Sequence, residues 1–172
     1  NNKILNATRI VFASYRSGNY DIYTMCPDGT DVRQVTTSPA SDREPNWSPD
    51  GSWIVFRSNR DDVPGNRDGE YEIFVVKADG TGLRQITANK ANDRLPVFSA
   101  DGKKIYFISN MEGPLYQLYS IFINGSGLKR VTHIDGDVYA PNCSKDGEWI
   151  LFQTNADPDA NNKMEIYKMH SN

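Results

Sequence analysis

The sequence predicts an all-β protein, a β-propeller of four four-stranded antiparallel blades in which the last blade lacks its fourth strand. Three stretches of the chain repeat one another: SDREPNWSPDGSWIVF (41–56), NDRLPVFSADGKKIYF (92–107) and GDVYAPNCSKDGEWILF (136–152). The runs between their turns are rich in β-formers, and no stretch shows convincing helical periodicity. Self-similarity at a fixed period is the signature of a repeat architecture.

The spacing of the repeat is constant for several unrelated markers. The turn Asp50-Gly51 recurs after 51 residues and again after a further 45 residues. Three more markers follow the same two intervals, namely the turn that starts at Asp28, Thr36 with Thr87 and Thr132, and Pro45 with Pro96 and Pro141. Four markers in agreement define the repeat unit.

Each repeat resolves into four short strands. The first carries a proline and a large residue (PNW, PVF, PNC), and a turn follows whose glycine supplies a positive φ. The second is the β-rich run WIVF, KIYF or WILF, with a further copy at residues 9–12. The third reads YDIYTM, YEIFVV, QLYSIF or MEIYKM, where alternation predicts one buried and one solvated face. A second glycine turn leads to a short fourth strand, RQVT, RQIT or KRVT.

These boundaries divide one domain, residues 1–172, into blades of about 1–36, 37–87, 88–132 and 133–172. The variation in repeat length falls in the loop between the second and third strands. Insertions in repeat proteins map to one face, often the binding face. We therefore expect this loop face to carry recognition.

A four-stranded unit of this size cannot bury both of its faces alone, and radial stacking covers them. The register predicts that the chain begins in the first strand of a blade and stops before the fourth strand of the last, which leaves an open edge. Three arrangements stay open. The chain could close as a four-bladed ring, with Lys3-Ile4-Leu5 serving the last blade. It could pair with a second copy as a homodimer, or it could be an excerpt of a propeller with six to eight blades.

Composition narrows the function classes. The net charge is −3, with 38% hydrophobic and 24% charged residues, and no basic face is indicated, which argues against a nucleic-acid partner. No apolar run is long enough to cross a membrane, so membrane insertion is not expected. Cys26 and Cys143 are too few for a disulfide framework and too isolated for a thiolate metal site.

The phrases PNWSPDGSWIVFRSNRD, YEIFVVKADGTGLRQIT and YDIYTMCPDGTDVRQVT resemble the repeat of TolB-like propellers, and the resemblance covers essentially the whole chain. It departs at Cys143, which stands where the other copies have an aromatic residue, and at Ala100 and Lys145, which replace the turn proline. The resemblance implies a periplasmic or extracellular binding scaffold with a protein partner. Similar blades also accompany serine peptidases and pectin-oligosaccharide lyases.

Enzyme chemistry finds little support. Gly125-Ser126-Gly127 reads as the turn after a third strand and not as a nucleophile elbow. The two histidines, His133 and His170, are too few for a histidine-based site. We expect no catalytic residue, no metal and no cofactor. One weak alternative is a calcium site of oxygen ligands at Asp157 and Asp159, or at Asp61, Asp62 and Asp68, in place of a solvated acidic turn.

The strongest positional signal is an Asp-Arg pair before the blade proline. Asp42-Arg43 and Asp93-Arg94 carry it, and Asp137 is assigned to the matching place in the next blade. Acids around an axis could bind a cation or a basic peptide. Alternatively, the Asp residues cap loop N–H groups and the Arg residues pair with a neighbouring blade.

Residues that differ between the copies are the other recognition candidates: Arg60, Asp61, Asp62, Arg67, Tyr116 and Tyr139. The function predicted is that of a non-catalytic scaffold that binds a protein or another ligand through the loop face. Two alternatives remain, an enzyme or enzyme-associated propeller acting on polysaccharide or peptide, and a self-assembling fragment that completes a larger ring as a homodimer.

Overall fold

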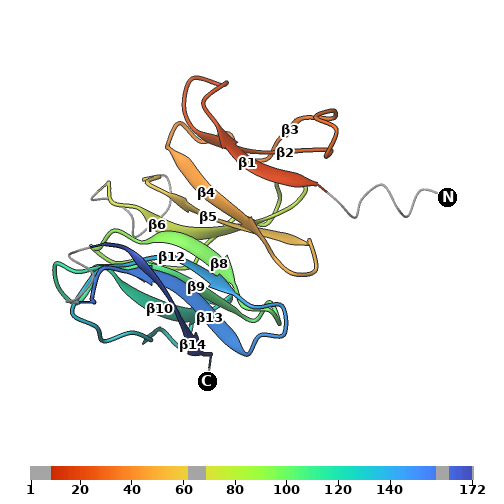
Figure 1. The fold of residues 1–172 in the computed structure, drawn as a ribbon. Helices are drawn as coiled ribbons and strands as arrows, with labels where there is room; N and C mark the ends of the chain where they lie inside the picture. Colours follow the sequence, from red (N-terminus) through yellow and green to blue (C-terminus); the bar gives the residue numbers. More distant parts are fainter. Residues whose placement is uncertain (1–8, 62–68, 158–162, 172) are drawn as a thin grey trace.

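The computed structural model describes residues 9–61, 69–157 and 163–171, which form four antiparallel sheets placed one after another along the chain (Figure 1). The first sheet holds β1 (Ile10–Ser14), β2 (Asp21–Met25) and β3 (Arg33–Gln34). The second holds β4 (Asp42–Trp47), β5 (Trp53–Ser58), β6 (Glu72–Lys77) and β7 (Arg84–Gln85). The third holds β8 (Arg94–Phe98), β9 (Lys104–Ser109), β10 (Gln117–Phe122) and β11 (Lys129–Arg130). The fourth holds β12 (Val138–Cys143), β13 (Trp149–Thr154) and β14 (Glu165–His170).

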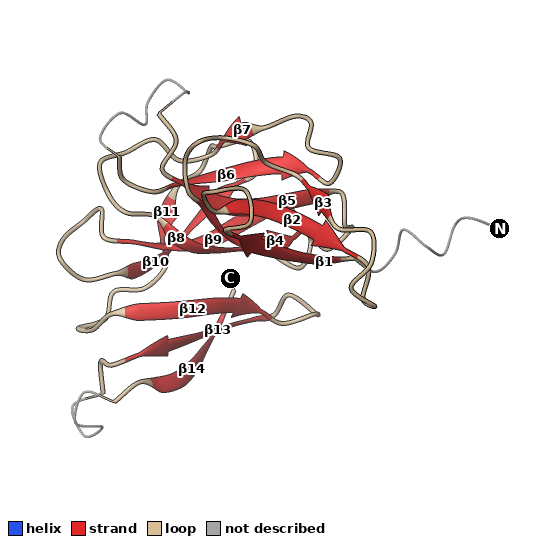
Figure 2. Ribbon diagram, turned by 90° about the horizontal axis from the view of Figure 1, so that it is seen from above, coloured by secondary structure: helices blue, strands red, loops and turns tan. Residues whose placement is uncertain are grey.

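This confirms the predicted all-β fold of four antiparallel blades, with three strands in the last one. Viewed from above, β12, β13 and β14 form a sheet of their own beside the others (Figure 2). The predicted first strand of the first blade, including Lys3-Ile4-Leu5, lies outside the described residues. No helix among residues 9–61, 69–157 and 163–171 meets the length and apolarity that a membrane crossing requires.

The blades are joined by three apolar cores. In each core the leading face of one blade, the face toward the next blade in the chain, packs on the trailing face of that next blade. Ile22 of the first blade meets Phe56 and Phe74 of the second. Val55 and Ile73 then meet Phe107 of the third blade. In the last core, Leu118 of the third blade meets Ile150 and Phe152 of the fourth. Burial between blades is therefore what holds the array together.

This packing overturns the predicted alternation of the third strands. In β2, β6 and β10 four or five successive residues are buried, including Ile73 and Phe74, which point to opposite faces. Both faces of β6 and β10 are dry because their sheets lie between two other blades. In β2, one face packs on the second blade and the Arg16 guanidinium lies over Tyr23 on the other. In β14 five of the six residues are exposed, and Ile166 is 72% exposed.

The first strands of the second, third and fourth blades, β4, β8 and β12, contain the same bulge. The pairing of β4 with β5 shifts between Arg43 and Asn46, and β8 and β12 shift at the equivalent positions. The bulged residues Glu44, Leu95 and Ala140 have φ values of 55°, 50° and 46°, in the left-handed region that L-residues rarely adopt. Each precedes a proline, so the strand bends at one fixed place in every blade.

Candidate binding surface at the loop end of the blades

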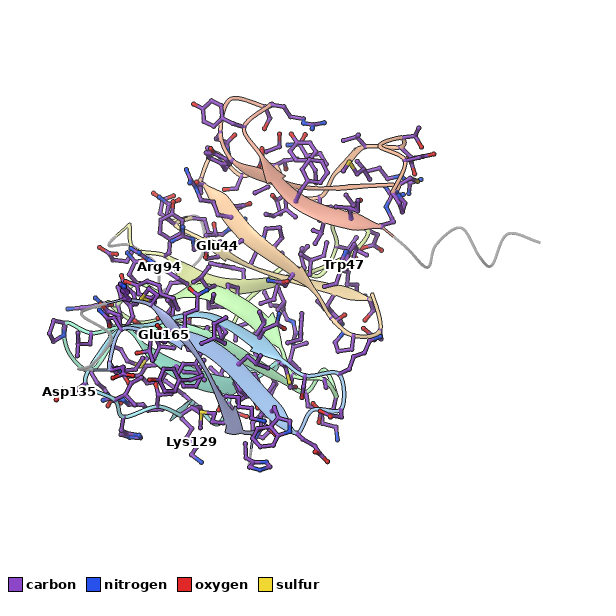
Figure 3. The ribbon with its side chains drawn as sticks, in the orientation of Figure 1. Glu44, Trp47, Arg94, Lys129, Asp135 and Glu165 are labelled. Carbon is purple, nitrogen blue, oxygen red and sulfur yellow. The ribbon has the colours of Figure 1, made fainter. Side chains whose placement is uncertain are left out.

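The predicted site residues gather at one end of the sheets. This end, called the loop end here, carries the connections from β5 to β6, β9 to β10 and β13 to β14, whereas the Asp-Gly turns lie at the other. The backbone N–H of Ser41 donates to Asn59 Oδ1 at 2.9 Å, which ties the start of β4 to the β5–β6 connection. Figure 3 shows Glu44 and Arg94 near each other at this end and Trp47 away from them.

Asp42 and Arg60 form a buried ion pair. Nη2 of Arg60 lies 2.8 Å and 3.0 Å from the two carboxylate oxygens of Asp42, and the two residues are 3% and 0% exposed. Burial raises the pKa of Asp42, while the Arg60 guanidinium and the hydroxyl of Ser58 oppose that rise. Neither side chain is accessible, so the geometry gives both a structural role between the first two blades.

Asp93 occupies the equivalent position in the third blade, with a different partner. Met111 stands where Arg60 would stand, and the buried carboxyl of Glu72 lies in the same network. Asn89 links the two acids, since its backbone N–H donates to Glu72 Oε1 at 2.7 Å and its Nδ2 donates to Asp93 Oδ2 at 2.9 Å. Burial raises the pKa of Glu72 to about 8, and burial also raises the pKa of Asp93. A proton held between two such buried acids would stabilise this network.

The matching place in the fourth blade belongs to Val138 and not to Asp137, so the predicted assignment is wrong by one residue. The N–H groups of Asp42, Asp93 and Val138 donate to Tyr20 O, Tyr71 O and Tyr116 O respectively. Asp137 instead matches Ser41, because its N–H donates to Asn155 Oδ1 at 2.8 Å. Its carboxylate accepts the N–H of Tyr116 at 2.8 Å. The third junction between blades is therefore uncharged, with Gln117 where Glu72 stands in the second blade.

The arginines beside these acids behave differently, because they stack on tyrosines. The guanidinium carbon of Arg43 lies 3.8 Å from the ring centre of Tyr20, in the preceding blade. Arg57 lies 4.2 Å from Tyr71, and Arg94 lies 4.9 Å from Tyr116. Tyr139, at the position equivalent to Arg43 and Arg94, is 6.4 Å from Tyr116 between ring centres. We call these seven half-buried side chains the arginine–tyrosine row.

Glu44 anchors the middle of the row. Its Oε1 lies 2.9 Å from Nη2 of Arg57, and its Oε2 accepts the backbone N–H of Leu95 at 2.8 Å. Both oxygens are thus engaged, one with each of two adjacent blades. Burial lowers the pKa of Arg57, and its neighbours Arg94 and Arg43 lower it further, so the three cations lie within electrostatic reach of one another.

The terminal nitrogens of the outer arginines are available. Among the described residues, Arg43 and Arg94 form no ion pair, and the hydrogen bond of each comes from Nε, to Ser41 Oγ and Asn92 Oδ1 respectively. Glu70 is nearby, since its Oε2 accepts from Asn92 Nδ2 at 2.7 Å. The row therefore offers cationic donors and aromatic faces across three blades.

The remaining candidates contribute less. Asp61 is exposed, whereas Asp62, Arg67, Asp68 and Asp159 lie outside the described residues. Within residues 9–61, 69–157 and 163–171, no group of three or more His, Cys, Asp or Glu side chains is arranged to hold a metal ion. His170 stacks on Trp149, with ring centres 4.0 Å apart, and the two cysteines are unpaired thiols.

Sequence reasoning missed Glu72, Glu44, Arg57, Tyr20 and Tyr71. The tyrosines carried a signal, because Tyr20, Tyr71 and Tyr116 follow the intervals of 51 and 45 residues. So did Glu72, which is equivalent to Asp21 and Gln117. Glu44 and Arg57 carried none, because their equivalents in the other blades are not charged.

Comparison with known proteins identifies the family. A family model described as TolB beta propeller domain matches residues 62–172, more than half of the chain. The chain belongs to the TolB β-propeller family. The TolB homolog of Chlorobium luteolum is 31% identical over 137 residues, which covers 59% of this chain and 31% of that protein. The Tol-Pal system protein TolB of Syntrophus aciditrophicus is 35% identical over 85 residues, which covers 47% and 17%.

The TolB fold also extends to more distant proteins. The crystal structure of TolB from Acinetobacter baumannii superposes with a TM-score of 0.74 at 21% identity and covers 96% of this chain and 39% of that one. Dipeptidyl-peptidase 5 of Porphyromonas gingivalis is 41% identical over 68 residues, which covers 40% of this chain and 10% of the peptidase. This TolB-type chain spans about a third of the length of the TolB homolog it matches.

Proposed function

We propose that this TolB-type propeller is a non-catalytic interaction module that binds a protein or peptide through the loop end of its blades. The observation that carries the proposal is the arginine–tyrosine row. Its outer arginines, Arg43 and Arg94, have unengaged terminal nitrogens in the part of the chain that the structure describes, and its tyrosines are half-buried. Tyrosine and arginine are the residues most enriched at binding hot spots.

The rigidity of the row supports the same role. Arg43 and Arg94 are each held by a tyrosine ring and by a local hydrogen bond, and Arg57 is held by Tyr71 and Glu44, so little side-chain entropy remains to be lost on binding. The bulge places these residues at the same height in successive blades. A partner laid across the blades would meet a fixed pattern of charge and ring faces.

The relatives point in the same direction. One carries a name that places it in the Tol-Pal system, and that name implies assembly with other proteins. By the same kinship we propose a periplasmic or extracellular location. The buried Asp42, Asp93 and Arg60 would support the surface from beneath, and Asp61, Asp137 and Tyr139 would border it.

A selection with matched variants tests this proposal. Random peptides displayed on phage are selected on the wild-type chain, and the enriched peptides are titrated against Arg43→Ala with Arg94→Ala. We expect the double variant to weaken binding at least tenfold, or about 1.4 kcal/mol. The control is Lys129→Ala, which removes an exposed cation from β11, away from the row (Figure 3). Equal binding by wild type and double variant would refute the proposal.

The peptidase relative motivates a second candidate, an enzyme or enzyme-associated propeller that acts on peptide or polysaccharide. This candidate uses the same surface at the loop end, but the molecule bound there would be a substrate and not a partner. Hydrolysis of a peptide or oligosaccharide panel by the isolated chain would favour it over the scaffold function.

A further inference from the structure

Each blade contains one stacked aromatic pair formed by its second and third strands. The pairs are Phe12–Tyr23, Phe56–Phe74, Phe107–Tyr119 and Phe152–Tyr167, with ring centres 5.9, 5.9, 5.9 and 6.2 Å apart. All four have interplanar angles of 28° or less. In the second, third and fourth blades, members of these pairs lie in the core shared with the preceding blade.

In three blades a long side chain covers this pair. The Arg16 guanidinium lies 4.9 Å from the Tyr23 ring and 5.3 Å from the Phe12 ring. The Arg60 guanidinium lies 5.0 Å from Phe74 and 5.6 Å from Phe56. Met111 packs on the core that contains Phe107 and Tyr119. The equivalent residue in the fourth blade is Ala156, so that pair has no such cover.

The polar frame that holds the arginines is nevertheless kept in the fourth blade. Nε of Arg16 donates to Ser14 Oγ, and Nε of Arg60 donates to Ser58 Oγ, each at 3.0 Å. Thr154 is the equivalent hydroxyl. It accepts the backbone N–H of Ala156 at 3.2 Å, as Ser58 accepts that of Arg60 at 3.2 Å.

The missing side chain leaves a hollow of about 390 Å³. Its lining is Ile134, Phe152, Thr154, Ala156, Asp157 and Tyr167. Tyr167 is 38% exposed, whereas its equivalents Tyr23, Phe74 and Tyr119 are 4% exposed or less. The absence of a fourth strand beside β14 in the described residues adds to this exposure. The third-strand ring of the pair, which is buried in three blades, is thus accessible in the fourth, whereas Phe152 stays buried.

Charge around the hollow favours a cation. Oδ2 of Asp157 lies 3.3 Å from the Tyr167 hydroxyl, and Glu165 pairs with Thr154 across the strands. Figure 3 shows Asp135 and Glu165 at the loop end of the lower blades. The equivalent of Asp42 in this blade is Val138, and the carboxylate that lines the hollow is that of Asp157.

We propose that this hollow is a binding site for the arginine side chain of a partner protein, which would take the place that Arg16 and Arg60 fill in the first two blades. The guanidinium would lie on the Phe152–Tyr167 pair, with Thr154 and Asp157 as acceptors. Ile134 would contact the apolar stem of the arginine. The inference deepens the proposed function, on which it rests for the partner being a protein.

The test uses N-acetyl-arginine amide as the probe, followed by amide chemical shifts of the whole chain. We expect saturable shifts at Thr154, Ala156 and Asp157, with a dissociation constant on the order of 1 mM. The neutral isostere N-acetyl-citrulline amide should bind at least about tenfold more weakly, because it has no charge for the rings or for Asp157. Shifts that are absent, or equal for the two probes, would overturn the site.

Three variants make the test specific. Asp157→Asn should weaken the arginine probe several-fold, whereas Glu148→Gln, an equal charge change at the other end of the same blade, should leave it unchanged. Ala156→Arg should abolish probe binding by filling the hollow from within. Should that variant not fold, Tyr167→Leu replaces it. Unaltered affinity in Asp157→Asn and Tyr167→Leu would contradict the proposal.

The outcomes separate this site from the arginine–tyrosine row. Arg43→Ala with Arg94→Ala should not change binding of the arginine probe. Loss of peptide binding in that double variant together with no response to the probe would refute the site and retain the proposed function.

Discussion

Asp42 and Glu72 show that buried acids at successive blade junctions can have different kinds of partner, a cation in one case and a second acid in the other. Asp42 meets a cation, Arg60, whereas Glu72 and Asp93 meet each other through Asn89. A buried charge without a partner is costly, so the second network must hold a proton where the first holds an arginine.

The acid pair predicts an unusual pH dependence. Since burial raises the pKa of Glu72 from 4.5 to about 8, the folded chain keeps a proton that the unfolded chain releases between these values. The free energy of unfolding should therefore decline as the pH rises from about 4.5 to about 8. Glu72→Gln should flatten this decline in thermal melts taken across the range.

The control for this melt series is Glu148→Gln, which changes an exposed carboxylate. It should retain the slope of the wild type. A wild-type melting temperature that rises steadily from pH 5 to pH 8, or a slope that Glu72→Gln leaves intact, would contradict proton sharing.

The ion pair gives a second prediction at the same scale. Arg60→Met should destabilise the chain by about 3–5 kcal/mol, because it leaves Asp42 buried without its cation. Adding Asp42→Val should recover most of this loss, since Met111 and Val138 already occupy the two equivalent positions in later blades. Urea unfolding of the single and double variants measures both values; a double variant no more stable than the single one would show that the pair acts through packing.

At the scale of the strand, the bulge is shared by three blades but could not be predicted from the repeated residues. Glu44, Leu95 and Ala140 differ in type, none is glycine, and each stands before a proline, a position that favours extended backbone. Left-handed φ at such residues is strained, and the surrounding pairing maintains it. The bulge follows directly after Arg43 in β4 and after Arg94 in β8, at the loop end of each strand.

Ala140 allows this strain to be measured, because it is exposed. Ala140→Gly should stabilise the chain by about 0.5–1 kcal/mol, since glycine adopts a positive φ without steric cost. Ala88→Gly, at an exposed position with ordinary φ, should be neutral or destabilising. A loss of stability in Ala140→Gly would argue that the bulge is not strained.

At the scale of the whole molecule, no blade among residues 9–61, 69–157 and 163–171 covers the leading face of the fourth blade. Ile166 is 72% exposed, whereas its equivalents Ile22, Ile73 and Leu118 are fully buried by the next blade. The leading face of each earlier blade is covered by the trailing face of the next blade. We propose that a blade from a second copy of the chain covers the leading face of the fourth blade.

Light scattering on a sizing column tests the association. We expect a species near twice the chain mass of 19.4 kDa, and Ile166→Asp should return it to the monomer. Lys129→Ala serves as the control on an outer strand. A wild-type monomer at every concentration would exclude the second copy and direct attention to other occupants of this face.

The sequence predicted much of this architecture, because the turns and prolines recur at fixed intervals. It did not reveal which faces of the third strands are dry, since burial there depends on the adjacent blade and not on the strand itself. The Asp137 assignment was wrong because residue type was preferred over register. Counting by the same intervals that locate Pro96 and Pro141 would have reached Val138.

The candidate surface was predicted only in part. Arg43, Arg94, Tyr116 and Tyr139 appear in both the sequence interpretation and the row, whereas Arg57 and Glu44 come from positions where the blades differ. Whether a given arginine is buried against an acid, as Arg60 is, or stacked and accessible, as Arg43 is, depends on neighbours that are distant in the sequence, Asp42 in the same blade and Tyr20 in the preceding one.

The three differing junctions have a consequence for how the chain assembles. A blade that docked on the wrong neighbour would part Glu72 from Asp93, or the Gln117 amide from the Gly136 carbonyl, whereas Asp42 keeps Arg60 because both belong to the second blade. Nearly identical units are prone to exchange places while a repeat protein folds. The acid pair at one junction and the amide at the next differ in chemistry, so they favour one sequential order of blades that look alike.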